Sequence, residues 1–307
     1  MTTEGENPGV ILASEMYKDF FKPNEVTVFR QAQERTQALV TGSAILAHLA
    51  EGTFEPNDLD VFVSQEGALD MGSAIISVGY TFTPLTEKIV GGRRAVRQQP
   101  KNFAHALDQE LAEWTPNTGK MGDRYSNSHI AGVFNFKKEG GKIIQVVATR
   151  CRPKEAVLKF YSTAVMNFAT HDEVTCLFPH FTIDKKTNLI LRDKNSEDVK
   201  RCTAKYEARG WKSVYTVTAY EAANPQSEVA TFQRNTNDVK SLKKSLVPQQ
   251  GQSKGGNRSP EAFWTVSFTN QEVTRVIQGE RTGCPECGRK ASEGEQVVAR
   301  QRECEQP

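Results

Sequence analysis

Residues 38–63, ALVTGSAILAHLAEGTFEPNDLDVFV, constrain the fold more than any other part of the chain. They predict a short strand that ends in glycine, a helix with apolar residues at helical spacing, a turn and a second strand. Alternate side chains of a strand share a face, so Asp58 and Asp60 project together, about 6.5 to 7 Å apart along the chain. Two carboxylates this close repel each other unless a proton or a cation lies between them. The stretch therefore predicts a strand–helix–strand unit that carries a candidate cation site.

The residues around this pair suit the binding of a polyphosphate. Mg²⁺ prefers oxygen ligands and is usually held by one or two carboxylates together with substrate phosphates; Mn²⁺ is the alternative ion. Ser43 begins the predicted helix, where free backbone N–H groups attract an anion. Gly42 has no side chain to keep a phosphate away from the backbone. Asp-Leu-Asp alone is common in turns and at exposed strand starts, so the order of the elements is what makes this interpretation specific.

This order of elements resembles the signature of the DNA-polymerase-beta-like nucleotidyltransferase superfamily. The resemblance implies a small mixed sheet with helices packed behind it. It also implies the transfer of a nucleoside monophosphate from a nucleoside triphosphate to an acceptor with two magnesium ions. Gly42 and Ser43 would then face the triphosphate, and Asp58 and Asp60 would hold the metals. Over most of residues 36–270, segments such as GVFNF, IIQVVAT and ARGW are similar to a fungal group of this fold that has no established substrate.

The position that matches the superfamily's third carboxylate holds Gln145, in the second strand of a predicted hairpin. Its same-face neighbours are Ile143 and Val147, so a shift of register brings no acid into place. An amide cannot accept a proton near neutral pH, and losing a general base typically costs about 100-fold to 10,000-fold in rate. Asp123 and Glu155 are alternative acids, but each is better explained as an exposed turn or helix-start charge. Two hypotheses therefore stay open: an active nucleotidyltransferase, and a binding or interaction module that retains its fold.

The whole chain predicts an α/β (α+β) protein in three parts. A nucleotidyltransferase-like core covers about 10–170 and ends in a long helix that begins at Pro153. A mainly helical accessory region follows over 171–278, and within it the polar segment 241–260 is predicted to be flexible. Residues 279–307 are polar and charged, which is typical of a disordered tail.

Two further groups of basic residues are candidates for phosphate binding. Arg93, Arg94 and Arg97 cluster in a glycine-bearing stretch and could contact a triphosphate or a nucleic-acid acceptor through their guanidinium groups. A solvated basic loop explains them equally well. Lys159, on the predicted helix after the hairpin, could reach a phosphate, although such a lysine more often covers apolar surface with its stem. The acceptor itself, whether small molecule, RNA or protein, is not identified by these residues.

Cysteine usage and charge bound the class of protein. Cys284 and Cys287 have the two-residue gap of a zinc knuckle, but a closed site needs four ligands, and the tail adds only Cys304 and no histidine. Free thiols in a disordered tail are the alternative. Lys plus Arg (39) nearly balances Asp plus Glu (37), so no global field attracts nucleic acid or an acidic membrane. No apolar run approaches the roughly 20 residues of a membrane span, and the start of the sequence lacks a secretory signal pattern. We therefore expect an intracellular protein, cytoplasmic or nuclear, with reduced cysteines and no membrane partner.

Overall fold

The structure is a computed structural model of the 307-residue chain. It describes residues 10–84, 87–90, 93–96, 100–112, 129–192, 195–230, 233–247, 260–269 and 272–279. The chain divides into two compact units, and each unit is discontinuous in sequence. Unit 1 comprises Met1–Val157, Val165–Cys176 and Leu242–Ser259, and unit 2 comprises Leu158–Ala164, Leu177–Ser241 and Pro260–Pro307. Across these described ranges, no helix has the length and apolar character needed to cross a membrane.

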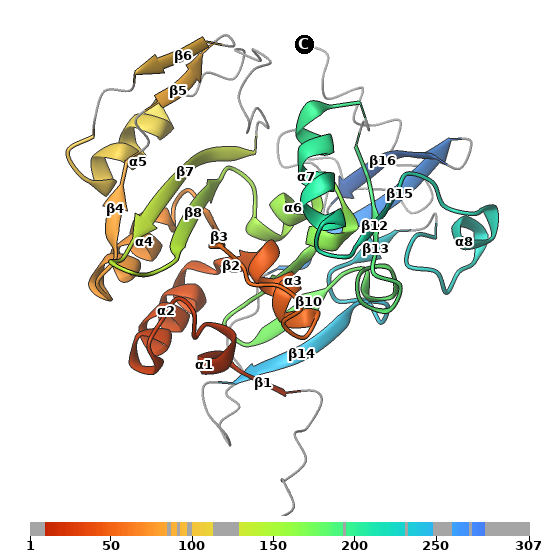
Figure 1. Cartoon of the computed structure of the whole chain (residues 1–307), viewed down its shortest axis with the longest axis horizontal. Coiled ribbons are helices and arrows are strands. Elements are labelled where there is room, and N and C mark those ends of the chain that lie inside the picture. The colour runs from red at the N-terminus through yellow and green to blue at the C-terminus, as the bar shows by residue number, and fades with distance from the viewer. Residues whose placement is uncertain are drawn as a thin grey trace, which may run out of the picture. The chain divides into compact units, whose positions relative to one another are not determined.

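Unit 1 is built on a mixed nine-stranded sheet with the order β1-β14-β10-β9-β2-β3-β8-β7-β4 (Figure 1). Its strands are β1 (Val10–Leu12), β2 (Leu39–Thr41), β3 (Asp58–Ser64), β4 (Thr81–Thr83), β7 (Ile130–Lys137), β8 (Ile143–Thr149), β9 (Asn167–Ala169), β10 (Glu173–Cys176) and β14 (Leu242–Val247). β3 and β8 are parallel, as are β1 and β14, and the other neighbours are antiparallel. The predicted α/β class with a mixed sheet is confirmed, and the sheet is larger than the small one expected.

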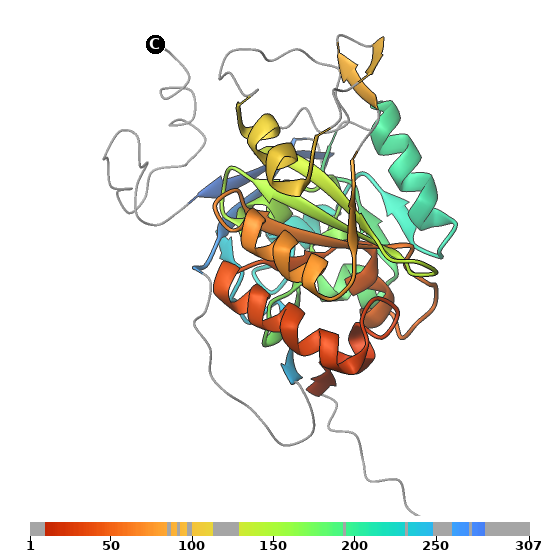
Figure 2. The same ribbon diagram turned by 90° about the vertical axis from the view of Figure 1, so that its left-hand side faces the viewer.

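The helices of unit 1 are α1 (Ala13–Met16), α2 (Pro23–Thr36), α3 (Ser43–Leu49), α4 (Ala68–Ser77), α5 (Phe103–Ala112) and most of α6 (Pro153–Leu158). Of these, α4 and α5 cover one face of the sheet at β3, β8 and β7. α4 packs on β3 and β8 and lies beside α2 (Figure 2). In α5, the ring of Phe103 makes edge contacts with Phe134 and Phe136 of β7. A Cβ at Gly72 of α4 would lie 2.1 Å from Cε1 of Phe103, so glycine is what lets α4 and α5 approach.

The alternation of β3 follows from this one-sided cover. Leu59 and Val61 are fully buried, whereas Asp58 and Asp60 are partly exposed. Because successive strand residues point to opposite faces, burying the first two side chains turns the two aspartates toward the other face. Once one face of the sheet is covered by helices, the alternation in the sequence therefore determines which way the two aspartates point.

The long helix predicted from Pro153 is wrong. α6 ends at Leu158, a short 3₁₀ turn follows at Thr163–Val165, and β9 takes Asn167–Ala169 into the sheet. The apolar spacing of this segment fits a helix, but Phe168 and Ala169 pair with β2 on one side and β10 on the other. Long-range pairing overrides a local helical pattern here, as tertiary context often does.

The region 171–278 is mixed, where a mainly helical one was expected. Besides β10 and β14, it contains α7 (Glu197–Glu207), α8 (Ala219–Ala223), β11 (Thr187–Leu189), β12 (Lys212–Val214), β13 (Arg234–Asn235), β15 (Phe263–Thr269) and β16 (Glu272–Gly279). Part of the segment 241–260, predicted to be flexible, forms β14 between β1 and β10 in the sheet of unit 1. The remainder, 248–259, and the predicted disordered tail beyond Gly279 lie outside the described residues.

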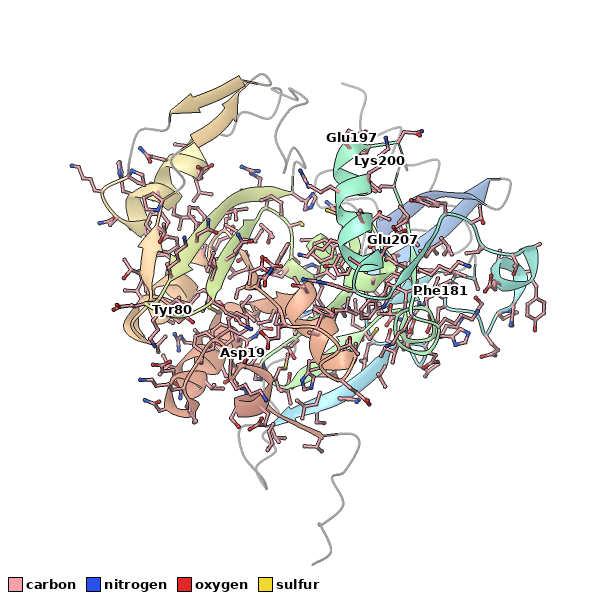
Figure 3. The ribbon with its side chains drawn as sticks, viewed as in Figure 1. Asp19, Tyr80, Phe181, Glu197, Lys200 and Glu207 are labelled. Atoms are coloured by element: carbon pink, nitrogen blue, oxygen red, sulfur yellow. The ribbon has the colours of Figure 1, made fainter. Side chains whose placement is uncertain are left out.

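Unit 2 carries smaller sheets of its own. β11 and β12 are parallel, and β13, β15 and β16 form an antiparallel sheet. At the start of α7, Lys200 and Glu197 form a 2.7 Å ion pair (Figure 3). Trp211 and Trp264 are fully buried and mark the core of this unit.

Candidate functional site

The two aspartates meet the start of α3 through Gly42. β2 pairs with β3 so that Thr41 is directly opposite Asp60, and Gly42 then turns the chain into α3 with a φ of +75°. A Cβ at position 42 would lie 2.6 Å from Oδ2 of Asp60. Glycine is therefore needed twice, because its φ is one that side chains disfavour and because the Asp60 carboxylate occupies the space of a side chain.

Ser43 connects the helix start to the other aspartate. Its Oγ donates a hydrogen bond to Oδ1 of Asp58 at 3.3 Å, and the residue is almost completely buried. Four residues predicted from the sequence to share a site, Gly42, Ser43, Asp58 and Asp60, thus lie within contact of one another in pairs. Their assignment to phosphate and metal remains a prediction.

One row of paired residues crosses the sheet through Asp60. From β9 to β7 it runs Phe168, Thr41, Asp60, Gln145 and Asn135, each directly opposite the next. Directly paired residues point to the same face, and adjacent strands lie about 4.8 Å apart. The row therefore places Gln145, the position that the resemblance matches to a third carboxylate, directly beside Asp60.

Gln145 is held by an amide on the neighbouring strand. Its Nε2 donates a hydrogen bond of 2.9 Å to Oδ1 of Asn135, and both residues are partly exposed. Asn135 is a site residue that the sequence analysis did not single out. The register of the predicted hairpin would have identified it, because its tight turn places Asn135 opposite Gln145.

The donor set suits one divalent ion better than two. Asp58 and Asp60 supply carboxylate oxygens from one face of β3, which fits the one or two carboxylates with which proteins usually hold Mg²⁺. In the part of the chain that the structure describes, no group of three or more His, Cys, Asp and Glu side chains could hold a metal. A protein-made cage is thus not formed here, and oxygen atoms of a bound substrate would have to complete the coordination.

Other charges near the site are already engaged. Lys142 directly precedes β8, and its Nζ lies 2.9 Å from Oδ2 of Asp19 and 3.8 Å from Oε2 of Glu55; Asp19 is labelled in Figure 3. In α3, burial and two nearby lysines hold the pKa of His48 below its usual value, so this imidazole is neutral near pH 7. The described surroundings therefore contribute neither a free lysine from this turn nor a cationic histidine.

The remaining sequence candidates are dispersed. Glu155 forms an ion pair of 2.7 Å with Arg152 in the first turn of α6. Lys159 belongs to unit 2, and its backbone oxygen accepts a hydrogen bond from Arg192. Asp123, Arg97 and the three tail cysteines lie outside the described residues, and Arg93 and Arg94 are described only as backbone of β6 (Arg93–Val96), which pairs with β5 (Glu87–Val90).

No protein-family model matches the sequence, and no curated protein matches it either. Two solved structures share part of the chain's arrangement. One is the Thermotoga maritima CCA-adding enzyme complexed with tRNA_CCA, at 10% identity and a TM-score of 0.35. The other is a CCA-adding enzyme in complex with CTP, at 13% identity and a TM-score of 0.33. Each match covers 59% of this chain and just over a third of the other chain (36% and 37%). Scores this low establish neither a family nor an activity for this protein.

Proposed function

We propose that the protein transfers a nucleoside monophosphate from a nucleoside triphosphate to a hydroxyl-bearing acceptor, with Mg²⁺ or Mn²⁺ as cofactor. The observation that carries this proposal is the junction of β2, α3 and β3. There, the hydroxyl of Ser43 contacts Asp58 and the backbone of Gly42 packs against the carboxylate of Asp60. A polar turn that contacts two carboxylates suits a metal-bound polyphosphate better than it suits a neutral ligand.

Each residue of the junction has a distinct task in this proposal. Asp58 and Asp60 hold the ion with one or two carboxylate oxygens. Ser43 orients Asp58 through its hydrogen bond. Gly42 keeps the Asp60 carboxylate close to the turn, because any side chain there would displace it. When bound, the magnesium ion would neutralise charge on the phosphate oxygens and on the two carboxylates.

The chemical step is an in-line displacement. The acceptor hydroxyl oxygen forms a bond to the α-phosphorus, and the bond from that phosphorus to the oxygen bridging the β-phosphate breaks. Pyrophosphate leaves with the bridging oxygen, and the hydroxyl proton passes to water. Positioning and charge stabilisation dominate the catalysis of phosphoryl transfer, so such a site can function slowly without a third carboxylate.

A thermal-shift screen tests the proposal. The purified chain is heated with each of the four common nucleoside triphosphates, with and without magnesium. A ligand that binds only the folded state adds about 2.7 kcal/mol to the free energy of unfolding at a concentration of 100 times its Kd, and this raises the melting temperature. We expect at least one triphosphate to raise it only when magnesium is present. If no triphosphate does so with magnesium or manganese, the proposal is wrong.

The hydrogen bond between Gln145 and Asn135 supports a second candidate function. An amide, that of Gln145, stands at the position matched to the third acid. Its Nε2 donates its hydrogen bond to Asn135 on β7. A fold that binds nucleotide but has lost turnover would retain Asp58 and Asp60 and tolerate this replacement. The alternative is therefore a nucleotide-binding or protein-interaction module without catalysis.

Gln145→Asp separates the two candidates. It places a third carboxylate directly beside Asp60, and a general base typically contributes about 100-fold to 10,000-fold in rate. If the chain is an enzyme, we expect label transfer from an α-labelled triphosphate to be kept or raised in this variant. Gln145→Asn is the matched control, because it shortens the side chain equally without adding charge. A binding module would show magnesium-dependent binding in all three proteins and transfer in none.

A further inference from the structure

The side-chain amide of Gln145 has its nitrogen turned away from the aspartates. Its Nε2 donates to Oδ1 of Asn135 at 2.9 Å, and Asn135 lies on β7, on the opposite side of β8 from Asp60. Among the described residues, this is the only hydrogen bond of the Gln145 side chain. The oxygen and the nitrogen of an amide diverge from one carbon. An amide whose nitrogen is bound on the side of β7 therefore presents its oxygen on the side of Asp60.

This orientation is the opposite of the one that a carboxylate by itself favours. An amide beside a carboxylate gains most by donating an N–H to it, because a hydrogen bond to a charged group contributes roughly twice as much as a neutral one. Gln145 instead donates to a neutral amide and leaves an accepting oxygen beside Asp60, with which it is directly paired. An amide oxygen and a carboxylate repel each other unless a cation or a donor lies between them. The orientation therefore suits a ligand that takes oxygen atoms from both residues.

The amide pair also lies on the accessible side of the acids. Toward β9, Thr41 and Phe168 are 0% and 1% exposed, so the row is closed in that direction. Gln145 and Asn135 are partly exposed, as the two aspartates are. All of these residues point to the same face, because each is directly paired with the next. A ligand held by the acids therefore borders the amide pair.

We infer that Oε1 of Gln145 is a third, neutral ligand of the ion at Asp58 and Asp60, and that Asn135 is the positioning residue that keeps this oxygen turned toward them. This inference rests on the proposed function, because it concerns the same ion. Carbonyl oxygens are suitable ligands for Mg²⁺ and Mn²⁺, and neighbouring strands about 4.8 Å apart allow one ion to contact side chains of both. Mg²⁺ prefers octahedral coordination, so three protein oxygens leave room for phosphate and water oxygens.

An amide pair across two strands can also serve only to join β8 to β7. The two roles of Asn135 differ in how they depend on residue 145. A carboxylate has an accepting oxygen at both ends, so Gln145→Glu presents an oxygen to the ion whichever way the side chain is turned. If Asn135 acts by orienting the amide, its effect on metal binding should largely disappear in the Gln145→Glu chain. If Asn135 only joins the strands, its effect should be the same in both chains.

Asn135→Leu tests the inference by metal binding, without nucleotide or acceptor. Leucine has the branched shape of asparagine and no hydrogen-bonding atom. The probe is Mn²⁺, titrated into the purified full chain, and the electron paramagnetic resonance signal of the free ion gives the affinity. We expect the affinity to fall about 10-fold to 100-fold, as when other residues that orient a metal ligand are replaced. In the Gln145→Glu chain, the same substitution should change the affinity only a few-fold, so that the two substitutions are coupled.

Thr83→Val is the matched control. Thr83 is directly opposite Asn135 on β4, so this variant loses a polar group from the same row on the side away from Gln145 and should bind Mn²⁺ as the parent does. If Asn135→Leu binds Mn²⁺ as tightly as the control, or loses affinity equally with Gln and Glu at position 145, Asn135 only joins the strands and the inference is wrong. A parent chain that binds no Mn²⁺, or binds it equally after Asp58→Asn and Asp60→Asn, also overturns the inference. The proposed function is tested separately by the triphosphate screen, so the two failures can be told apart.

Discussion

The double variant Asp58→Asn, Asp60→Asn is expected to lose all magnesium-dependent stabilisation by nucleoside triphosphates. Each amide oxygen is a weak neutral ligand, so the pair no longer supplies the negative charge that holds a hard cation. A metal ion contributes several kcal/mol of charge stabilisation in the transition state, so turnover should fall by at least about 1000-fold. The measurements are the thermal shift with and without magnesium and label transfer from the α-phosphate.

The same variant should fold normally. Asparagine has the shape of aspartate, and an amide oxygen at position 58 can still accept the hydrogen bond from Ser43. Two carboxylates on one strand face repel each other, so without metal the double variant should be at least as stable as the parent. Asp70→Asn, which removes an exposed acid paired with Arg35, is the control and should leave nucleotide binding intact. Parent-like binding or transfer by the double variant would remove the basis of the proposed function.

Arg234→Ala is expected to be the most destabilising single change in unit 2. The Arg234 side chain is 1% exposed, and its Nε and Nη2 bind both carboxylate oxygens of Asp238 at 2.8 and 3.0 Å. It also donates to the backbone oxygens of Glu228 and Leu177 and lies over the rings of Phe178 and Trp264. One guanidinium therefore connects segments that are far apart in the sequence.

Removing one partner of a buried ion pair leaves the other partner unpaired, which typically costs about 3 to 5 kcal/mol. We expect a loss of that size in the free energy of unfolding by urea. Arg234→Lys should recover little of it, because an ammonium cannot reproduce the two-point contact with Asp238. A loss below about 1 kcal/mol, the level of an exposed pair, would show that the pair is solvated.

Asp238 determines how the destabilisation caused by Arg234→Ala changes at low pH. Burial alone would raise the pKa of its carboxyl, but hydrogen bonds from Arg234 and Ser241 outweigh it and hold the pKa below the usual value. A depressed pKa contributes stability that is present above the unfolded value, near 3.9 for Asp, and is lost as the pH falls through the folded value. The difference in unfolding free energy between parent and Arg234→Ala should therefore narrow below about pH 4.

The acidic pair shows how far local sequence carries a prediction. Asp58 and Asp60 alternate with Leu59 and Val61, and this period alone predicts a strand with two carboxylates on one side. The order Gly42, Ser43, helix, turn and strand likewise leaves few ways to close the antiparallel pair β2–β3. The hairpin β7–β8 is equally local, since a Glu-Gly-Gly turn joins two apolar runs.

The errors have one physical origin. The segment after Pro153 has apolar residues at helical spacing, and nothing within it indicates that Phe168 will pair with Thr41. The segment 242–247, LKKSLV, is separated from β10 by residues 177–241, yet it pairs with β10 and with β1. Pairing partners that are distant in sequence leave no local pattern, because the energy that selects them belongs to both strands at once.

The sequence by itself determined the mixed α/β class, the strand that presents Asp58 and Asp60, and the amide at position 145. These follow from alternation, turn residues and the chemistry of single side chains. Only the tertiary structure decided that the carboxylate of Asp60 fills the space at Gly42 and that Asn135 holds Gln145. Each of these contacts joins strands or helices whose proximity depends on sheet register, and register is set by burial and pairing across the whole sheet.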